Sequence, residues 1–153
     1  MTFQDVLLLV AAMTCGAAVR YGSAPERVLS SAFLASLLLE EAFAALVGRE
    51  FATQYDAIYL ALELVLLLVV CAVALRANRV YPLWLGGAQI IAVAAHALPR
   101  TLGEGSLLAC ELIDTGGVAV GLFVLIVGLR CHARRQQRLG RTYPDWTVAA
   151  ERV

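Results

Sequence analysis

The sequence predicts an all-α integral membrane protein, folded as an up-and-down bundle of five transmembrane helices. Of its 153 residues, 61% are hydrophobic and only 16% are charged, which is more apolar surface than a soluble domain of this size can bury. The apolar residues form runs of helical length and do not alternate with polar residues as in the strands of a β-barrel. Short polar breaks separate the runs, so consecutive helices are expected to lie antiparallel.

Five apolar segments carry this prediction. A helix needs about 20 residues to cross a hydrocarbon core of roughly 30 Å. The fourth segment reaches that length without a charge, and the second, third and fifth reach it if their internal acids are tolerated. The first segment is short, so four spans with a re-entrant first segment are the alternative; Asp5 and the lack of a basic leader predict that it is not a cleaved signal peptide. The segments are Val6–Val19, Val28–Val47, Ala57–Leu75, Val80–Pro99 and Ser106–Leu129.

The placement of arginine predicts the direction of the chain across the membrane. The chain has 12 basic residues, all arginine, and 12 acids, and this zero net charge excludes a general nucleic-acid binder. If the amino terminus is outside, only Arg49 and Arg100 lie on the outer side, and the other arginines lie in the cytoplasmic loops and tail. The prediction is N-out/C-in, with a bundle over residues 1–129 and a basic cytoplasmic tail over residues 130–153. We expect the tail, His132 included, to lie in water at anionic lipid headgroups.

Six ionisable side chains lie inside the predicted spans. A carboxylate exposed to lipid is costly even on the most lenient insertion scale, so these side chains should face the bundle interior, a wet cavity or a partner protein. At about 1.5 Å per residue, their distances from the span ends put them in one layer roughly 5–12 Å below the outer face. Four different helices contribute to this layer. The residues are Glu40, Glu41, Glu63, His96, Glu111 and Asp114.

Helical spacing supports a meeting of these side chains. Glu111 and Asp114 are spaced i, i+3 and share a helix face. Glu40 and Glu41 differ by about 100° in direction, so only one of them can face a common site. Arginines at the outer span ends are long enough to reach the acids and neutralise them. The supporting residues are Asp56 and Gln89, which share faces with Glu63 and His96, and Arg49 and Arg100.

Several carboxylates with one imidazole are suited to binding a cation, a divalent metal ion included, or to holding protons. The sequence therefore predicts an ion- or proton-binding site that serves transport, sensing or ion coupling. The ion-binding chain is expected to act as a homo-oligomer. Two alternatives stay open. As the first alternative, the acids pair structurally within the bundle or with a partner, which would make the chain an accessory subunit of a larger membrane complex. The chain can also be a membrane metallohydrolase, which is the weakest interpretation because the layer holds one histidine and no nucleophile constellation.

The fifth segment carries Gly117 and Gly121 in a small-xxx-small pattern. This pattern lets helices approach closely, and we expect it to serve packing inside the monomer more than dimerisation.

Three stretches also occur together: Pro25-Glu26-Arg27, Arg79-Val80-Tyr81-Pro82-Leu83-Trp84 and Ala94-Ala95-His96. Over roughly residues 20–100, the chain resembles small uncharacterised polytopic inner-membrane proteins of alphaproteobacteria. The resemblance implies a multi-pass protein of the bacterial inner membrane with four or five helices. It implies no activity.

Overall fold

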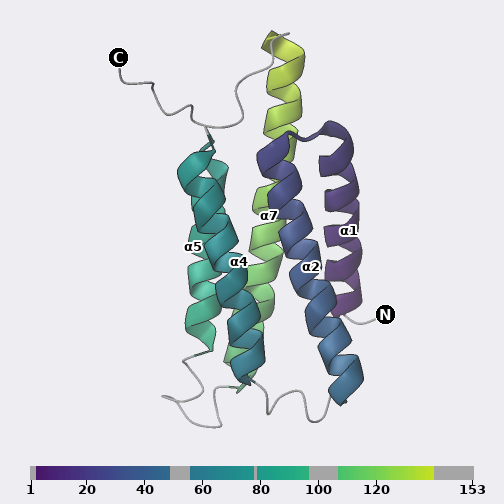
Figure 1. The fold of residues 1–153 in the computed structure, drawn as a ribbon, viewed down its shortest axis with the longest axis vertical. Coiled ribbons are helices and arrows are strands. Elements are labelled where there is room, and N and C mark those ends of the chain that lie inside the picture. The colour runs from purple at the N-terminus through teal and green to yellow at the C-terminus, as the bar shows by residue number, and fades with distance from the viewer. Residues whose placement is uncertain (1–2, 49–55, 78, 97–106, 140–153) are drawn as a thin grey trace.

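The computed structural model describes residues 3–48, 56–77, 79–96 and 107–139, and in these residues all regular structure is helical. Five helices lie side by side, with their axes roughly along the long axis of the bundle (Figure 1). They are α1 (Phe3–Tyr21), α2 (Ala24–Val47), α4 (Asp56–Arg76), α5 (Tyr81–Ala95) and α7 (Leu107–Leu139). The predicted helical bundle is confirmed for this part of the chain.

Four of these helices are long and apolar enough to cross a membrane: α1, α2, α4 and α7. The described part of α5 is also apolar but has 15 residues, and the predicted end of its span, at Pro99, lies outside the described residues. α1 begins at Phe3 and ends at Tyr21, so the first helix is longer than the segment that the apolar run marks. Its length removes the reason for treating it as re-entrant.

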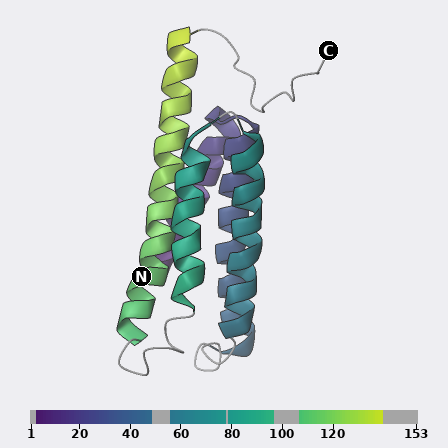
Figure 2. The same cartoon turned by 90° about the vertical axis from the view of Figure 1, so that its left-hand side faces the viewer.

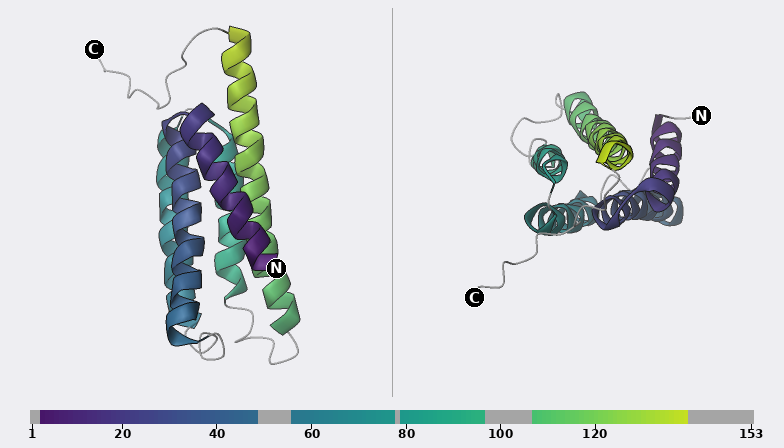
Figure 3. Two further views of the ribbon diagram at one scale, coloured as in Figure 1. Left: turned by 90° about the vertical axis from the view of Figure 1, so that its right-hand side faces the viewer. Right: turned by 90° about the horizontal axis from the view of Figure 1, so that it is seen from above.

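The helices form a closed ring rather than a row. Each helix contacts the next one along the chain, and α7 contacts both α5 and α1, as the view from above shows (Figure 3). α7 also reaches across the ring to contact α2. The first and last helices are therefore neighbours, although they are the farthest apart in sequence.

Two tight connections lie at the same end of the ring, which we call the Arg79 end (residues 20–27 and 76–82). Gly22 joins α1 to α2, and a Cβ atom there would lie 2.6 Å from the carbonyl oxygen of Ala18, so only glycine fits. Pro25 and Pro82 are buried in the first turns of α2 and α5, where a missing N–H costs no helical hydrogen bond. We call the opposite end, where α2 ends and α4 begins, the Glu40 end.

The core is filled by aliphatic and aromatic side chains from all five described helices, with Leu7 and Ala11 contributed by α1. Leu29, Phe33, Val70 and Leu85 have almost no exposed surface. The glycine pattern of α7 serves this packing: a Cβ on Gly121 would lie 2.8 Å from the Cζ atom of Phe33. A Cβ on Gly117 would lie 3.3 Å from the Cβ of Ala92. The expectation that these glycines pack within the monomer is confirmed for both positions.

The outer surface of the ring is apolar. Large hydrophobic side chains on several helices are exposed, among them Leu68, Leu75, Trp84 and Phe123, and Trp84 is 71% exposed. An apolar surface this extensive is unusual for a soluble monomer and suits a bundle surrounded by lipid.

α7 extends ten residues beyond Leu129, the predicted end of the fifth span, and projects past the other helices (Figure 2). The helix continues because arginine, alanine and glutamine are good helix formers, although the arginines mark the end of the apolar run. His132, expected in the wet tail, is only 8% exposed. This expectation was wrong because His132 lies four residues after Gly128 and seven after Leu125, on the buried face of α7. Residues 140–153 lie outside the described residues.

Candidate functional site

The structure brings Glu40 and Glu63 to one small cavity inside the ring, in the half nearer the Glu40 end. The cavity measures about 10 Å³, which is about the space that one water molecule needs. Four helices contribute to its wall. The lining residues are Phe33, Ser36, Leu37, Glu40, Glu63, Leu66, Gln89 and Val118.

Glu63 enters this cavity from α4 and is held by Gln89 of α5. The side-chain amide of Gln89 donates a hydrogen bond to Oε2 of Glu63. Glu63 is 5% exposed and Gln89 is 4% exposed, so the bond lies in the interior of the bundle. The local reason is helical periodicity: Glu63 shares its face with buried Leu66, Val70 and Val73.

Glu40 reaches the cavity from α2. The hydroxyl of Ser36, one turn earlier on the same helix, donates a hydrogen bond of 3.1 Å to Oε1 of Glu40. Ser36 is buried and Glu40 is half-buried. Sequence reasoning missed Ser36, although its i, i+4 spacing to Glu40 is a signal that could have found it.

Two other predicted residues lie near the cavity without lining it. Glu41 is half-buried and is directed differently from Glu40, as their spacing of one residue requires. His96 follows the last residue of α5 and is half-buried, but it is not part of the cavity wall. Of the described acids in the predicted layer, the cavity thus unites two.

The remaining predicted residues, or their side chains, lie outside the part of the chain that the structure describes. Glu111 and Asp114 belong to α7, and Asp56 is the first residue of α4, but the described residues do not include their side chains. Arg49 and Arg100 lie outside the described ranges altogether. Their part in the predicted layer remains an expectation.

The described residues of the cavity wall include two acids and no base. Carboxylate, carboxamide and hydroxyl oxygens are ligands that hard cations prefer. Within the described ranges, no group of three or more His, Cys, Asp or Glu side chains is arranged to hold a metal ion. The arrangement can therefore hold a proton, or a cation that accepts a few oxygen ligands.

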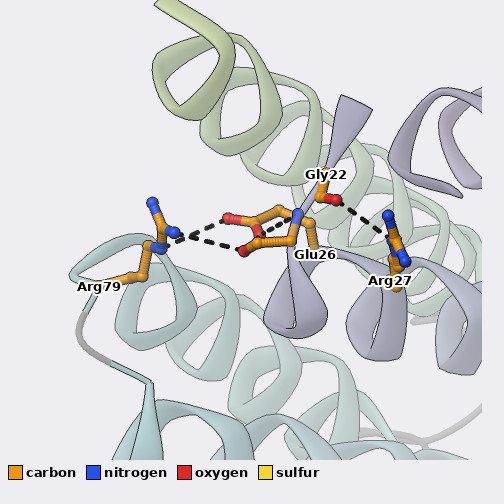
Figure 4. Close-up of polar contacts among 5 residues, drawn as sticks. Gly22, Glu26, Arg27 and Arg79 are labelled. Carbon is orange, nitrogen blue, oxygen red and sulfur yellow. Dashed lines mark hydrogen bonds and ion pairs between the residues drawn. The ribbon is translucent and has the colours of Figure 1, made fainter. Parts of the chain in front are cut away.

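A second buried polar cluster lies at the Arg79 end and was not predicted (Figure 4). Nε of Arg79 lies 3.7 Å from Oε1 of Glu26, and these side chains are 8% and 2% exposed. Arg79 also donates a hydrogen bond of 3.3 Å to the hydroxyl of Ser23, and the backbone N–H of Ser23 donates one of 3.1 Å to Oε2 of Glu26. These contacts fasten the start of α2 to the connection between α4 and α5.

The signal for half of this cluster is present in the sequence. Ser23 followed three residues later by Glu26 is a capping-box pattern, which places Glu26 on the first turn of a helix. Nothing local indicates that Arg79, from a different hairpin, completes the cluster. Arg27, next to Glu26, instead donates a hydrogen bond of 3.2 Å to the carbonyl of Gly22.

Fold and site together define a class: a ring of apolar helices, four of them long enough to cross a membrane, around a buried carboxylate cavity. No family model, no curated protein and no solved structure matches the chain. The function is therefore argued from the residues themselves.

Proposed function

We propose that the chain is a polytopic inner-membrane protein in which Glu40 and Glu63 form an internal site for a proton or a small cation. The observation that carries this proposal is the approach of two carboxylates, from α2 and α4, to one cavity with room for about one water molecule. A charge in a protein interior costs several kcal/mol unless it is compensated. A proton or a cation between the two acids reduces the repulsion between them and so lowers the cost of placing both at one cavity.

The size of the site favours a proton or a monovalent cation over a calcium-type ion. Ca²⁺ takes about 6–8 oxygen ligands. Among the residues that the structure describes, the polar part of the cavity wall consists of Ser36, Glu40, Glu63 and Gln89. The amide of Gln89 is already bonded to Glu63, and the hydroxyl of Ser36 to Glu40.

Burial favours an internal role over a contact with a partner subunit. Glu63 is 5% exposed within its own chain, so it is not on the surface that a partner would cover. The proposed role is therefore ion or proton coupling within this bundle, and an accessory-subunit role is the second interpretation of the same acids.

Arginine placement supports the proposed direction in the membrane. The described arginines gather at the Arg79 end and on the extension of α7, which favours this end as the cytoplasmic one. The Glu40 end then faces the periplasm, and the cavity lies in the outer half of the membrane.

Infrared spectroscopy of the purified protein in lipid nanodiscs tests the site. We expect a band from a protonated carboxyl group. This band should be lost in Glu63→Gln and shifted in Glu40→Gln. The band should remain in Glu41→Gln, the matched control, because Glu41 does not line the cavity. Addition of Na⁺, K⁺ or Ca²⁺ alone then distinguishes a cation site, where one of them removes the band, from a proton site, where none does.

The proposal fails if the spectrum shows no such band and the wild-type protein binds none of the three cations. It also fails if the folded double variant Glu40→Gln/Glu63→Gln keeps the same band or the same cation binding as the wild type. Circular dichroism confirms that the variant is folded.

A further inference from the structure

A second, larger hollow lies between α1 and α7, on a different part of the ring from the carboxylate cavity. This α1/α7 groove has a volume of about 350 Å³. α1 crosses α7 at an angle along it (Figure 3). Its lining residues are Val10, Met13, Thr14, Ala17 and Tyr21 from α1, and Ile126, Leu129, Arg130 and Ala133 from α7.

Most of the groove wall is apolar. The α1 residues follow i, i+3, i+4, i+7 and i+11, and the α7 residues follow i, i+3, i+4 and i+7, so each set forms one continuous helix face. The hydroxyl of Thr14 donates a hydrogen bond of 2.7 Å to the carbonyl of Val10, which satisfies this polar group within α1. The groove is thus suited to a flexible hydrocarbon chain.

Positive charge gathers at one end of the groove. α1 and α7 both run toward the Arg79 end, so Tyr21 and Arg130 lie toward that end. Arg20 donates a hydrogen bond of 3.0 Å to the hydroxyl of Tyr21, which adds a guanidinium from α1. Arg134, exposed and one turn after Arg130, adds another from α7. Among the described residues that line the groove, none is acidic.

We propose that the α1/α7 groove binds one anionic phospholipid, with an acyl chain along its apolar wall and the phosphate at Arg130, Arg134 and Arg20. The apolar channel matches the acyl chain of the lipid. The arginines at the expected cytoplasmic boundary match its anionic headgroup. Basic pockets between transmembrane helices on the cytoplasmic side bind anionic headgroups in this way. The inference rests on the membrane placement in the proposed function and not on the carboxylate cavity.

Native mass spectrometry of the detergent-purified protein, titrated with phosphatidylglycerol or phosphatidylcholine, tests this site. We expect tighter retention of phosphatidylglycerol, and each of Arg130→Gln and Arg134→Gln should weaken it about fivefold. Arg135→Gln is the matched control, because Arg135 lies about 140° around α7 from Arg130. Retention of phosphatidylcholine should be equal in all of these variants.

A second variant tests the apolar channel. Ala17→Trp fills the groove and should abolish the retention of both lipids, whereas Leu9→Trp, at an exposed position of α1 outside the groove, should not. Glu63→Gln should leave lipid retention unchanged, so a failure of this inference is distinguishable from a failure of the carboxylate site.

Two results overturn the lipid site. One is equal retention of phosphatidylglycerol by the wild type, Arg130→Gln and Arg134→Gln. The other is a dimer that Ala17→Trp dissociates while lipid retention stays the same, since a second copy of the chain would then occupy the groove.

Discussion

At the scale of single residues, the bundle buries carboxyl groups near both of its ends, and the groups that contact these carboxyls differ between the two ends. At the Arg79 end, Glu26 faces the cation of Arg79 and accepts hydrogen bonds from Ser23. At the Glu40 end, two carboxylates face one cavity and their described hydrogen bonds come from neutral groups, Ser36 and Gln89. In the first arrangement the opposite charge comes from the chain itself, which indicates a structural role. The second is suited to taking up a positive charge from outside.

Removing one partner of the Arg79–Glu26 pair should be more harmful than removing both. Arg79→Met leaves a buried, uncompensated carboxylate and should lower the free energy of unfolding by about 3–5 kcal/mol. The double variant Glu26→Gln/Arg79→Met should recover most of this loss, because no charge then remains buried. Thermal unfolding in detergent micelles, followed by circular dichroism, measures both effects.

Arg27→Gln is the control for this prediction. Arg27 is exposed at the same end of the bundle, and its substitution should change the free energy of unfolding by no more than about 0.5 kcal/mol. If the double variant is as unstable as Arg79→Met, the loss of stability does not come from an uncompensated charge on Glu26, and the prediction is wrong.

The two clusters also differ in how far they could be predicted. Depth predicts that Glu40 and Glu63 lie at one level, because their distances from the span ends are similar and the helices are antiparallel. Depth does not decide which of Glu40 and Glu41 faces the cavity. Predicting Ser36 and Gln89 as part of the site requires knowing which residues share a helix face. The sequence analysis named Gln89 on this ground and missed Ser36. The Arg79–Glu26 pair was beyond sequence reasoning, since it depends on which helix hairpins lie side by side.

At the scale of elements, α7 determines the shape of the ring. Its glycines accept Phe33 from α2 and Ala92 from α5, and Gly128 lies against the ring of Tyr81. Side chains at these positions would hold α7 away from its neighbours. The small-xxx-small pattern predicted this close approach, but not which helices make it.

Gly121→Ala should therefore destabilise the bundle. The new Cβ would lie 2.8 Å from the Cζ atom of Phe33, and overpacking of this kind costs typically about 1–3 kcal/mol. Gly116→Ala, five residues earlier on the same helix, has nothing within 4 Å of the new Cβ and should leave stability unchanged or slightly higher. Unfolding midpoints of the two variants in the same detergent measure the difference, and equal midpoints would contradict the packing of α7 on α2.

Helix existence was easier to predict than helix ends. Long apolar runs separated by short polar breaks indicate the five helices, because both features can be read directly along the sequence. Leu129 is the predicted end of the fifth span, because the arginines beyond it leave the apolar run, and the basic tail after it was expected to be helical. The structure shows this helix to Leu139. The buried position of His132 follows from that continuation.

At the scale of the whole molecule, the arrangement of charge makes a definite prediction about direction in the membrane. Cys131 is exposed on α7, two residues beyond the apolar run and beside Arg130. With Cys131 as the sole cysteine, a membrane-impermeant maleimide should label inverted inner-membrane vesicles and should leave intact spheroplasts unlabelled. Labelling in intact spheroplasts would reverse the proposed orientation.

Cys71 provides the control for this experiment. It is exposed on α4, inside a candidate membrane span, so lipid should shield it from the same reagent in both preparations. Detergent solubilisation should make it reactive.

Closure of the ring by the last helix has a consequence for biogenesis. While the ribosome is still making residues beyond α5, the inner faces of α2 and α5 have no partner where Gly121 and Leu122 later pack. Until then Phe33 and Leu85 lack the side of their packing that α7 provides, and the proposed membrane setting would shield them with lipid. Synthesis of α7 ends that stage, because only then can Gly121 and Leu122 pack against α2 and α5.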